Sequence, residues 1–141
     1  MKIVSLLLLV ICIGTGCSSQ KKTDMTGTQI EYTAMSRGLY KRIVVQDQKV
    51  SVTNGRDTEA IVSEIDNAKW NKIVSEFEKI NLDSLSALKA PTEKRFYDGA
   101  AIGNLKIIQN PKTYETTGFD NGFPPKKIEK LVNLLTDFAK K

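Results

Sequence analysis

Two short segments of the sequence combine aromatic rings, a carboxylate and glycine, and they are the places where binding chemistry is most plausible. They span residues 95–99 and 118–125. The candidate binding residues within them are Arg95, Tyr97, Asp98, Phe119, Asp120 and Phe123. Aromatic rings with a few polar groups are typical of a small pocket for a sugar or a peptide. The alternative is turn chemistry, with Asp-Gly and Asn-Gly pairs forming turns while the aromatics close the ends of the core.

Catalysis has few residue types to draw on. The chain contains no histidine, which excludes Ser-His and Cys-His nucleophilic arrangements and would leave a zinc site to carboxylates alone. Asp98 and Asp120 could supply the two carboxylates, about 5–10 Å apart, that glycoside hydrolysis requires. A small folded part with two helices leaves little room for a substrate cleft. We therefore expect no catalytic residue, no metal and no cofactor, and a protein that is not an enzyme.

The chain opens with a pattern that is typical of exported proteins. A positive residue, Lys2, precedes an aliphatic run over residues 3–13, which only Ser5 and Cys12 interrupt. This run is too short to anchor a protein across a bilayer, which takes about 20 apolar residues. Its length and its positive start match the apolar region of a secretory signal peptide.

Small residues lead from this run to Cys17, in the order Gly-Thr-Gly-Cys. Here the chain resembles the lipobox of bacterial lipoproteins, although Gly14 stands where Leu, Val or Ala is usual. The resemblance covers the first 17 residues. It implies that Cys17 carries a thioether-linked diacylglycerol and becomes the new N-terminus. The alternative is ordinary secretory cleavage, which would leave Cys17 as a free thiol.

The resemblance also implies a division of the chain and a location. Residues 1–16 would be the signal peptide, residues 17–28 the acylated cysteine with a flexible polar tether, and residues 29–141 a single domain. Ser18 and Ser19 follow the cysteine, which by lipoprotein sorting rules implies the outer membrane, facing the periplasm. Loss of the signal peptide lowers the formal net charge from +5 to +4. Since no aromatic-basic motif accompanies this charge, we expect no nucleic-acid partner.

The first half of the domain predicts strands followed by a helix. Apolar and polar residues alternate over residues 30–34, and strands are also expected at 39–46 and 48–53. Asn-Gly at residues 54–55 is a strong turn signal. These strands should form an antiparallel meander. Residues 56–64 are open to two interpretations, a short further strand or a lead into the helix.

The first helix should begin after Asp66, which has the position of an N-cap residue. Its apolar stripe runs to about residue 80, and Asn81 can end it. Trp70 lies on this stripe, so we interpret it as a core residue rather than a platform for a ligand. Residues 82–88 carry leucine at every third position, which indicates one or two short helical turns.

The second half predicts another hairpin followed by another helix. Strands are expected at residues 104–109 and 114–117 on either side of Asn110-Pro111, a turn signal. The last helix should have a proline of the pair Pro124-Pro125 in its first turn. Its buried stripe would consist of Ile128, Leu131, Val132, Leu135 and Phe138.

Residues 41–49 align without gaps on residues 104–112, so the two halves resemble repeats of a β-hairpin plus a helix. The pattern predicts an α+β domain, with one antiparallel sheet of about five strands and two helices packed on one face. The other face of the sheet would be partly exposed and open to a partner. The whole pattern loosely resembles small uncharacterised envelope lipoproteins of Bacteroidota-type bacteria, a resemblance that implies no particular activity.

Three functions fit this sequence. The first is a lipid-anchored envelope protein, held to the membrane by the lipid on Cys17, whose domain binds an envelope protein or a glycan without catalysis. The second is a receptor for a sugar or a peptide that uses the aromatic segments at 95–99 and 118–125. The third is an inhibitor of an envelope hydrolase, which would insert the tip of the hairpin at Asn110-Pro111 into an active site.

Overall fold

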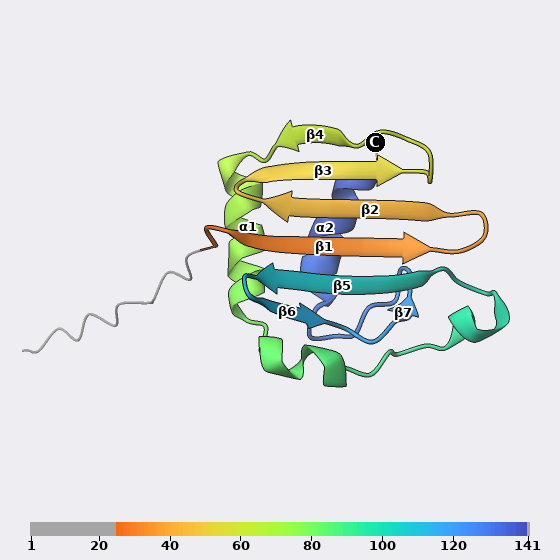
Figure 1. Cartoon of the computed structure of the whole chain (residues 1–141). Coiled ribbons are helices and arrows are strands. Elements are labelled where there is room, and N and C mark those ends of the chain that lie inside the picture. Colours follow the sequence, from red (N-terminus) through yellow and green to blue (C-terminus); the bar gives the residue numbers. More distant parts are fainter. Residues whose placement is uncertain (1–24, 141) are drawn as a thin grey trace, which may run out of the picture.

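The computed structural model describes residues 25–140. The predicted signal peptide and lipid site at Cys17 lie outside this part of the chain. The described residues form seven strands, two α-helices and three short 3-10 turns (Figure 1). The strands are β1 (Thr28–Met35), β2 (Tyr40–Gln46), β3 (Lys49–Asn54), β4 (Ile61–Glu64), β5 (Ile102–Gln109), β6 (Lys112–Glu115) and β7 (Phe119–Asp120). The helical elements are α1 (Asn67–Glu78), η1 (Leu82–Ala87), η2 (Lys94–Tyr97), α2 (Glu129–Thr136) and η3 (Asp137–Ala139).

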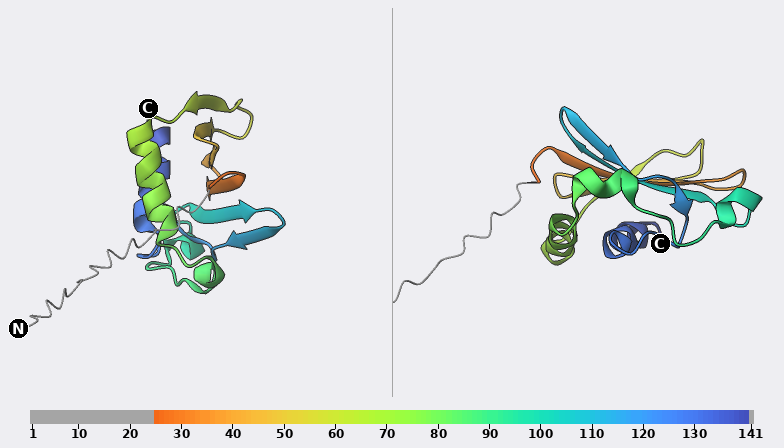
Figure 2. Two further views of the ribbon diagram at one scale, coloured as in Figure 1. Left: turned by 90° about the vertical axis from the view of Figure 1, so that its left-hand side faces the viewer. Right: turned by 90° about the horizontal axis from the view of Figure 1, so that it is seen from below.

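The strands form one antiparallel sheet in the order β4-β3-β2-β1-β5-β6, and β7 pairs with β5. Figure 2 shows that α1 and α2 cover the same face of this sheet. The α+β class, the single antiparallel sheet and the two helices on it are therefore confirmed. The sheet has seven strands rather than about five, because the open segment at residues 56–64 contains β4 and a two-residue strand such as β7 is too short to show a period.

The core lies between the sheet and the helices. In β1, Ile30, Tyr32 and Ala34 are buried toward the helices, while the residues between them face the other side of the sheet. This alternation is the period of a strand with one covered face. The helices contribute their apolar stripes, with Ile73 and Phe77 of α1 fully enclosed. Trp70 is partly buried and packs against this core, in keeping with the interpretation from its helical position.

The two hairpins turn between the strands that the sequence predicted. Asp47 and Gln48 connect β2 to β3 with positive φ angles of 48° and 60°, the conformation of a tight two-residue hairpin turn. Asn110 and Pro111 connect β5 to β6 through a cis peptide bond. Both hairpins of the aligned halves therefore exist. A true duplication of the two halves stays a prediction.

The start of α1 agrees with the sequence prediction, whereas the start of α2 differs from it. Asp66 caps α1, since its carboxylate accepts a hydrogen bond of 2.9 Å from the Lys69 N–H. The expectation of a proline in the first turn of the last helix is wrong, because α2 begins only at Glu129. Pro124 and Pro125 are buried and precede a turn in which the Ile128 N–H donates to the Pro125 carbonyl.

The sheet has two distinct ends. The described chain enters at Met25 and starts β1 at one end, where β2 and β5 finish (Figure 1). At the opposite end β1 finishes, β2 and β5 begin, and η2 lies beside them. We call this opposite end the distal end. Within residues 25–140, no helix has the length and hydropathy needed to cross a bilayer.

Candidate functional site

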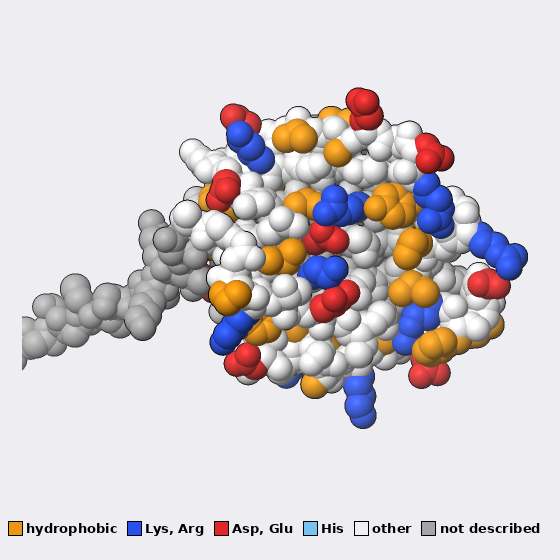
Figure 3. Space-filling view, in the orientation of Figure 1, with side chains coloured by type: hydrophobic (Ala, Val, Ile, Leu, Met, Phe, Trp, Pro, Cys, Tyr) orange, Lys and Arg blue, Asp and Glu red, His pale blue; other side chains and the backbone are white. Residues whose placement is uncertain are grey.

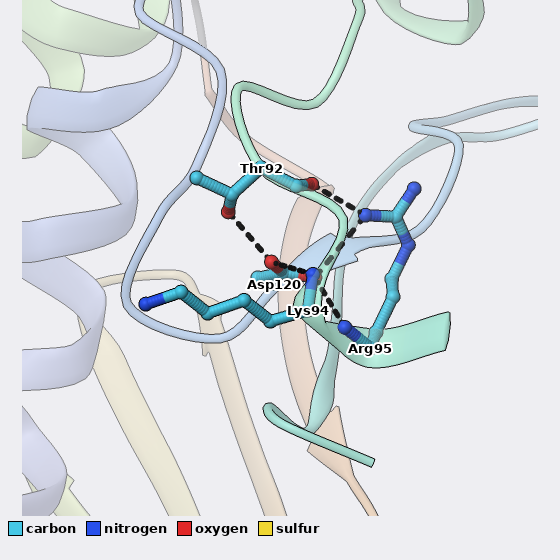
Figure 4. Close-up of polar contacts among 4 residues, drawn as sticks. All are labelled: Thr92, Lys94, Arg95 and Asp120. Carbon is cyan, nitrogen blue, oxygen red and sulfur yellow. Dashed lines mark hydrogen bonds and ion pairs between the residues drawn. The ribbon is translucent and has the colours of Figure 1, made fainter. Parts of the chain in front are cut away.

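The segment that carries the first candidate loop is held to the sheet by one buried carboxylate. The Asp120 side chain is inaccessible to solvent. One of its oxygens accepts hydrogen bonds from the Thr92 hydroxyl (2.6 Å) and the Lys94 N–H (2.7 Å). The other accepts from the Arg95 N–H (2.9 Å) and the Arg95 guanidinium (3.1 Å). Figure 4 shows these contacts converging on Asp120 from the segment that leads into η2.

These donors keep Asp120 ionised despite its burial. Desolvation raises the pKa of Asp120, but the hydrogen bonds from Thr92, from the Arg95 and Lys94 N–H groups and from the Arg95 side chain together lower it to about 2. The guanidinium of Arg95 is itself fixed by the Thr92 carbonyl, which accepts from it at 2.7 Å. A buried charge that is paired and hydrogen-bonded in this way is stable in the ionised state. We call Thr92, Lys94, Arg95 and Asp120 the carboxylate clasp.

The clasp changes the role of two residues that the sequence singled out for ligand binding. Asp120 and Arg95 do meet, as the two candidate segments suggested, but they bind each other. Asp98 stands elsewhere, exposed at the end of η2 with a positive φ of 57°. Asp120 already accepts four hydrogen bonds, so it does not match the role of a catalytic acid or base that the pairing with Asp98 would require.

Thr92 and Lys94 had no signal of their own in the sequence. They lie 28 and 26 residues before Asp120, and Lys94 contributes a backbone N–H that any residue except proline could supply. The antiparallel pairing of β7 with β5 brings Asp120 within hydrogen-bonding distance of Thr92 and Lys94.

Phe119 is a core residue rather than a ligand contact. Its ring is fully buried and packs against the ring of Tyr32, with centroids 6.3 Å apart. The Tyr32 hydroxyl donates a hydrogen bond of 2.6 Å to the Asn121 side chain, and burial raises the pKa of Tyr32 to about 12. Gly103 permits this packing, because a Cβ atom there would lie 2.8 Å from the Phe119 ring. The alternative interpretation, in which this aromatic closes the core, is correct for Phe119.

The other aromatic residues of the two segments, which are the candidates Tyr97 and Phe123 and the adjacent Phe96, point toward solvent. Phe96 and Tyr97 are each 72% exposed, and Phe123 is 46% exposed. The Arg95 guanidinium lies 4.3 Å from the centre of the Phe96 ring, and the Lys94 ammonium lies 4.8 Å from that of Phe123. Cations at these positions interact favourably with the ring faces. The exposed rings are thus oriented by the same segment that the clasp holds.

Further apolar side chains are exposed on the sheet at the same end of the molecule. Met35 is a direct register neighbour of both Tyr40 and Ile102, and Met35 and Ile102 are about half exposed. They occupy the distal end of the face that the helices leave open, where Figure 3 shows hydrophobic side chains in a row. We define the distal patch as Met35, Tyr40, Phe96, Tyr97 and Ile102. The sheet residues of this patch have no shared signal in the sequence, because only strand register makes them neighbours.

The hollow on the helical layer is separate from the two candidate loops. It has a volume of about 500 Å³ and is lined mainly by polar residues, among them Lys72, Glu76, Lys130 and Asp137. Among residues 25–140, no group of three or more His, Cys, Asp or Glu side chains is arranged to hold a metal ion.

Comparison of the chain with models of protein families, with curated proteins and with solved structures yielded no match. The predicted pocket for a sugar or peptide loses Phe119 and Asp120, which are inaccessible to solvent. The sequence predicted an enclosed pocket. The structure instead has an open surface, the distal patch, at this end of the sheet.

Proposed function

We propose that the protein is a lipid-anchored cell-envelope protein whose domain binds an envelope protein or a glycan through the distal patch, without catalysis of its own. The observation that carries the proposal is the 72% exposure of Phe96 and Tyr97 on a segment that the buried Asp120 holds in place. Soluble domains rarely expose adjacent large aromatics without a use for them. Aromatic side chains are also the usual energetic centre of an interface.

The rigidity of the segment supports a binding role. An aromatic side chain buries about 150–250 Å² on association, but ordering a mobile loop would offset much of that gain. Here the clasp orders the backbone at Lys94 and Arg95 before any partner arrives. Tyr97 packs back on Gly99, where a Cβ atom would lie 2.8 Å from the tyrosine ring. The rings are therefore preorganised for contact.

The position of the patch also fits an anchored protein. The described chain enters the sheet at the start of β1, and Met35 of the patch lies at the other end of this strand, seven residues after Thr28. At about 3.3 Å per residue this separation is about 23 Å. A lipid on Cys17 would attach the chain to the membrane from the end of the sheet opposite the patch, which leaves the patch free to meet a partner in the periplasm.

The test is affinity capture from a cross-linked envelope extract, with the full-length protein as bait. One protein or glycan should be enriched by the wild type and by Cys17→Ser, which lacks the lipid site but keeps the patch. The double variant Phe96→Ser with Tyr97→Ser should lose that target. Lys126→Ala is the matched control, because its side chain is 94% exposed and lies outside the distal patch.

A target captured equally by the wild type and the double serine variant would rule out the distal patch as the binding surface. The lipid anchor has a separate test. Mass spectrometry of the mature N-terminus should find diacylglycerol on Cys17, and Cys17→Ser should appear in the soluble fraction. An unmodified cysteine at the mature N-terminus would contradict the anchor without affecting the patch.

A further inference from the structure

The edge strand β4 exposes apolar side chains along a free side of the sheet. It is the last strand on its side of the sheet order, and in Figure 1 nothing lies beyond it. All four of its residues are exposed, Ile61 by 74% and Val62 by 63%. Proteins usually protect such an edge with proline, a bulge, a covering loop, charged side chains or a very short strand. β4 has only four residues and ends in Glu64, but it contains no proline, and its β-branched residues can pair with another strand.

The hydrogen-bond pattern identifies which backbone groups of β4 are free to pair. The Ile65 N–H donates to the Gln48 carbonyl at 2.9 Å, and the Ile65 carbonyl accepts from the Gln48 side-chain amide at 3.0 Å, so Ile65 directs its backbone groups toward Gln48. Because such pairs alternate along an antiparallel ladder, Ser63 and Ile61 direct their backbone groups to β3. The register pairs Val62 with Ser51 and Glu64 with Lys49. Val62 and Glu64 therefore direct their N–H and C=O groups away from β3, to the free edge.

The open face next to this edge can accept the side chains of an added strand. Val62, Ser51 and Val44 are successive register neighbours across β4, β3 and β2. They line a hollow of about 430 Å³ on that face. A side chain of an added strand opposite Val62 would continue this row and cover part of its apolar surface.

The charge of the edge selects the partner. Residues 57–64 contain Asp57, Glu59 and Glu64 and no basic residue, whereas the chain as a whole has a net charge of +5. Figure 3 shows acidic side chains along this edge of the molecule. A second copy of the chain would bring the same three acids against each other, which is unfavourable. An extended segment with lysine or arginine beside apolar residues is complementary to this edge.

We propose that β4 is a docking edge for an extended basic segment of a partner protein, which adds to the sheet as a further strand. This surface is separate from the distal patch, and the argument for it does not depend on the proposed function. The backbone groups of Val62 and Glu64 supply the pairing. Glu59 and Glu64 supply the charge preference.

The test measures fluorescence anisotropy of a labelled peptide, acetyl-Lys-Val-Thr-Val-Lys-amide, with the full-length protein in detergent. The peptide should bind, and a version with Glu in place of Lys should bind at least about tenfold more weakly, a difference of about 1.4 kcal/mol. Val62→Pro removes an outward N–H and should weaken binding by about tenfold or more. Val62→Thr retains the N–H and should bind within about twofold of the wild type.

Two further measurements separate strand addition from simple attraction between opposite charges. N-methylation of alternate peptide amides should abolish binding in only one of the two possible alternations, because only one side of the added strand faces β4. The double variant Glu59→Lys with Glu64→Lys should reverse the preference in favour of the Glu peptide. Phe96→Ser with Tyr97→Ser should leave peptide binding unchanged, so that failure here and failure of the distal patch are distinguishable.

The proposal is overturned if the Lys peptide does not bind at millimolar concentration, or if it binds Val62→Pro as tightly as the wild type. Equal effects of both methylation patterns would also overturn it. Sedimentation identifies the competing occupant. A dimer of the wild type that Val62→Pro dissociates would mean that a second copy, rather than a basic partner segment, occupies β4.

Discussion

At the scale of single residues, the buried charge of Asp120 determines how the distal end is built. An isolated carboxylate in this position would take up a proton, since burial alone disfavours the charged form. Asp120 stays ionised because Thr92, Lys94 and Arg95 direct donors at both of its oxygens. Removal of the charge would leave those donors without an acceptor, and this is what makes the residue sensitive to substitution.

Asp120→Asn should therefore destabilise the domain while keeping the shape of the side chain. Its amide group would face donors from Thr92 and Arg95, and we expect the melting temperature to fall by roughly 5–10 °C. Circular dichroism during thermal unfolding measures this change. Asp98→Asn is the matched control, because Asp98 is exposed at the end of η2 and its substitution should leave the melting temperature within about 1–2 °C.

The same carboxylate predicts a dependence of stability on acid. The pKa of Asp120 is lowered to about 2 in the folded protein, against about 3.9 for an unfolded chain. Its contribution to stability is thus complete above about pH 4 and is lost as the pH falls toward 2. Wild-type stability should fall more steeply over this range than that of Asp120→Asn. Parallel acid profiles for the two proteins would contradict the assignment.

The close packing around Gly103 predicts that a larger residue at this position destabilises the core. A Cβ atom there would lie 2.8 Å from the Phe119 ring and 3.1 Å from the Tyr32 hydroxyl oxygen. We expect Gly103→Ala to lower the free energy of unfolding by about 1–3 kcal/mol, the usual result of overpacking a filled core. Urea unfolding measures it. Ala100→Gly serves as a comparison, and a Gly103→Ala variant as stable as the wild type would show that the rings can move apart.

At the scale of elements, the start of α1 depends on one side chain. The Asp66 carboxylate accepts from the Lys69 N–H at 2.9 Å, which satisfies one of the donors that a helix leaves unpaired at its beginning. Asp66→Ala should cost about 1 kcal/mol in unfolding free energy, whereas Asp66→Ser should cost little, since serine is also a good cap. Equal losses in both variants, measured by urea unfolding, would argue against capping as the cause.

At the scale of the whole molecule, the two ends of the sheet should differ in their distance from the membrane. Lys112 starts β6 at the end where the tether enters, whereas Tyr97 lies at the distal end (Figure 1). If Cys17 is acylated, Lys112→Cys and Tyr97→Cys each introduce the single free thiol of the mature protein. A fluorophore on the first should be quenched more strongly by brominated lipids in vesicles than one on the second.

Cys17→Ser with the same labels is the control, because without the lipid neither fluorophore should respond to the vesicles. Stronger quenching at Tyr97 than at Lys112 would mean that the distal patch faces the membrane. That result would overturn the orientation in which the patch is presented to a periplasmic partner, and would leave the fold and the clasp unaffected.

Several elements were predictable because their signals are local. The alternation of Ile30, Tyr32 and Ala34 indicates a strand with one buried face, and the position of Asp66 indicates the start of a helix. The hairpin turn at Asn110-Pro111 is likewise a local signal. β4 stayed open between two interpretations, since Ile61 and Val62 are adjacent and have no period. The prolines before α2 suggested a helix start that tertiary packing moved to Glu129.

By itself the sequence determined the α+β class, the order of hairpins and helices, and the absence of histidine chemistry. Residue types can be read directly, and the apolar periods of two residues for a strand and 3.6 for a helix depend only on neighbours in the chain. The tertiary structure decided which candidate residues face solvent. Burial of Phe119 and Asp120, the distal patch and the free edge at β4 depend on strand register and on contacts between residues far apart in sequence. No local pattern contains that information, since it arises only when distant segments pack together.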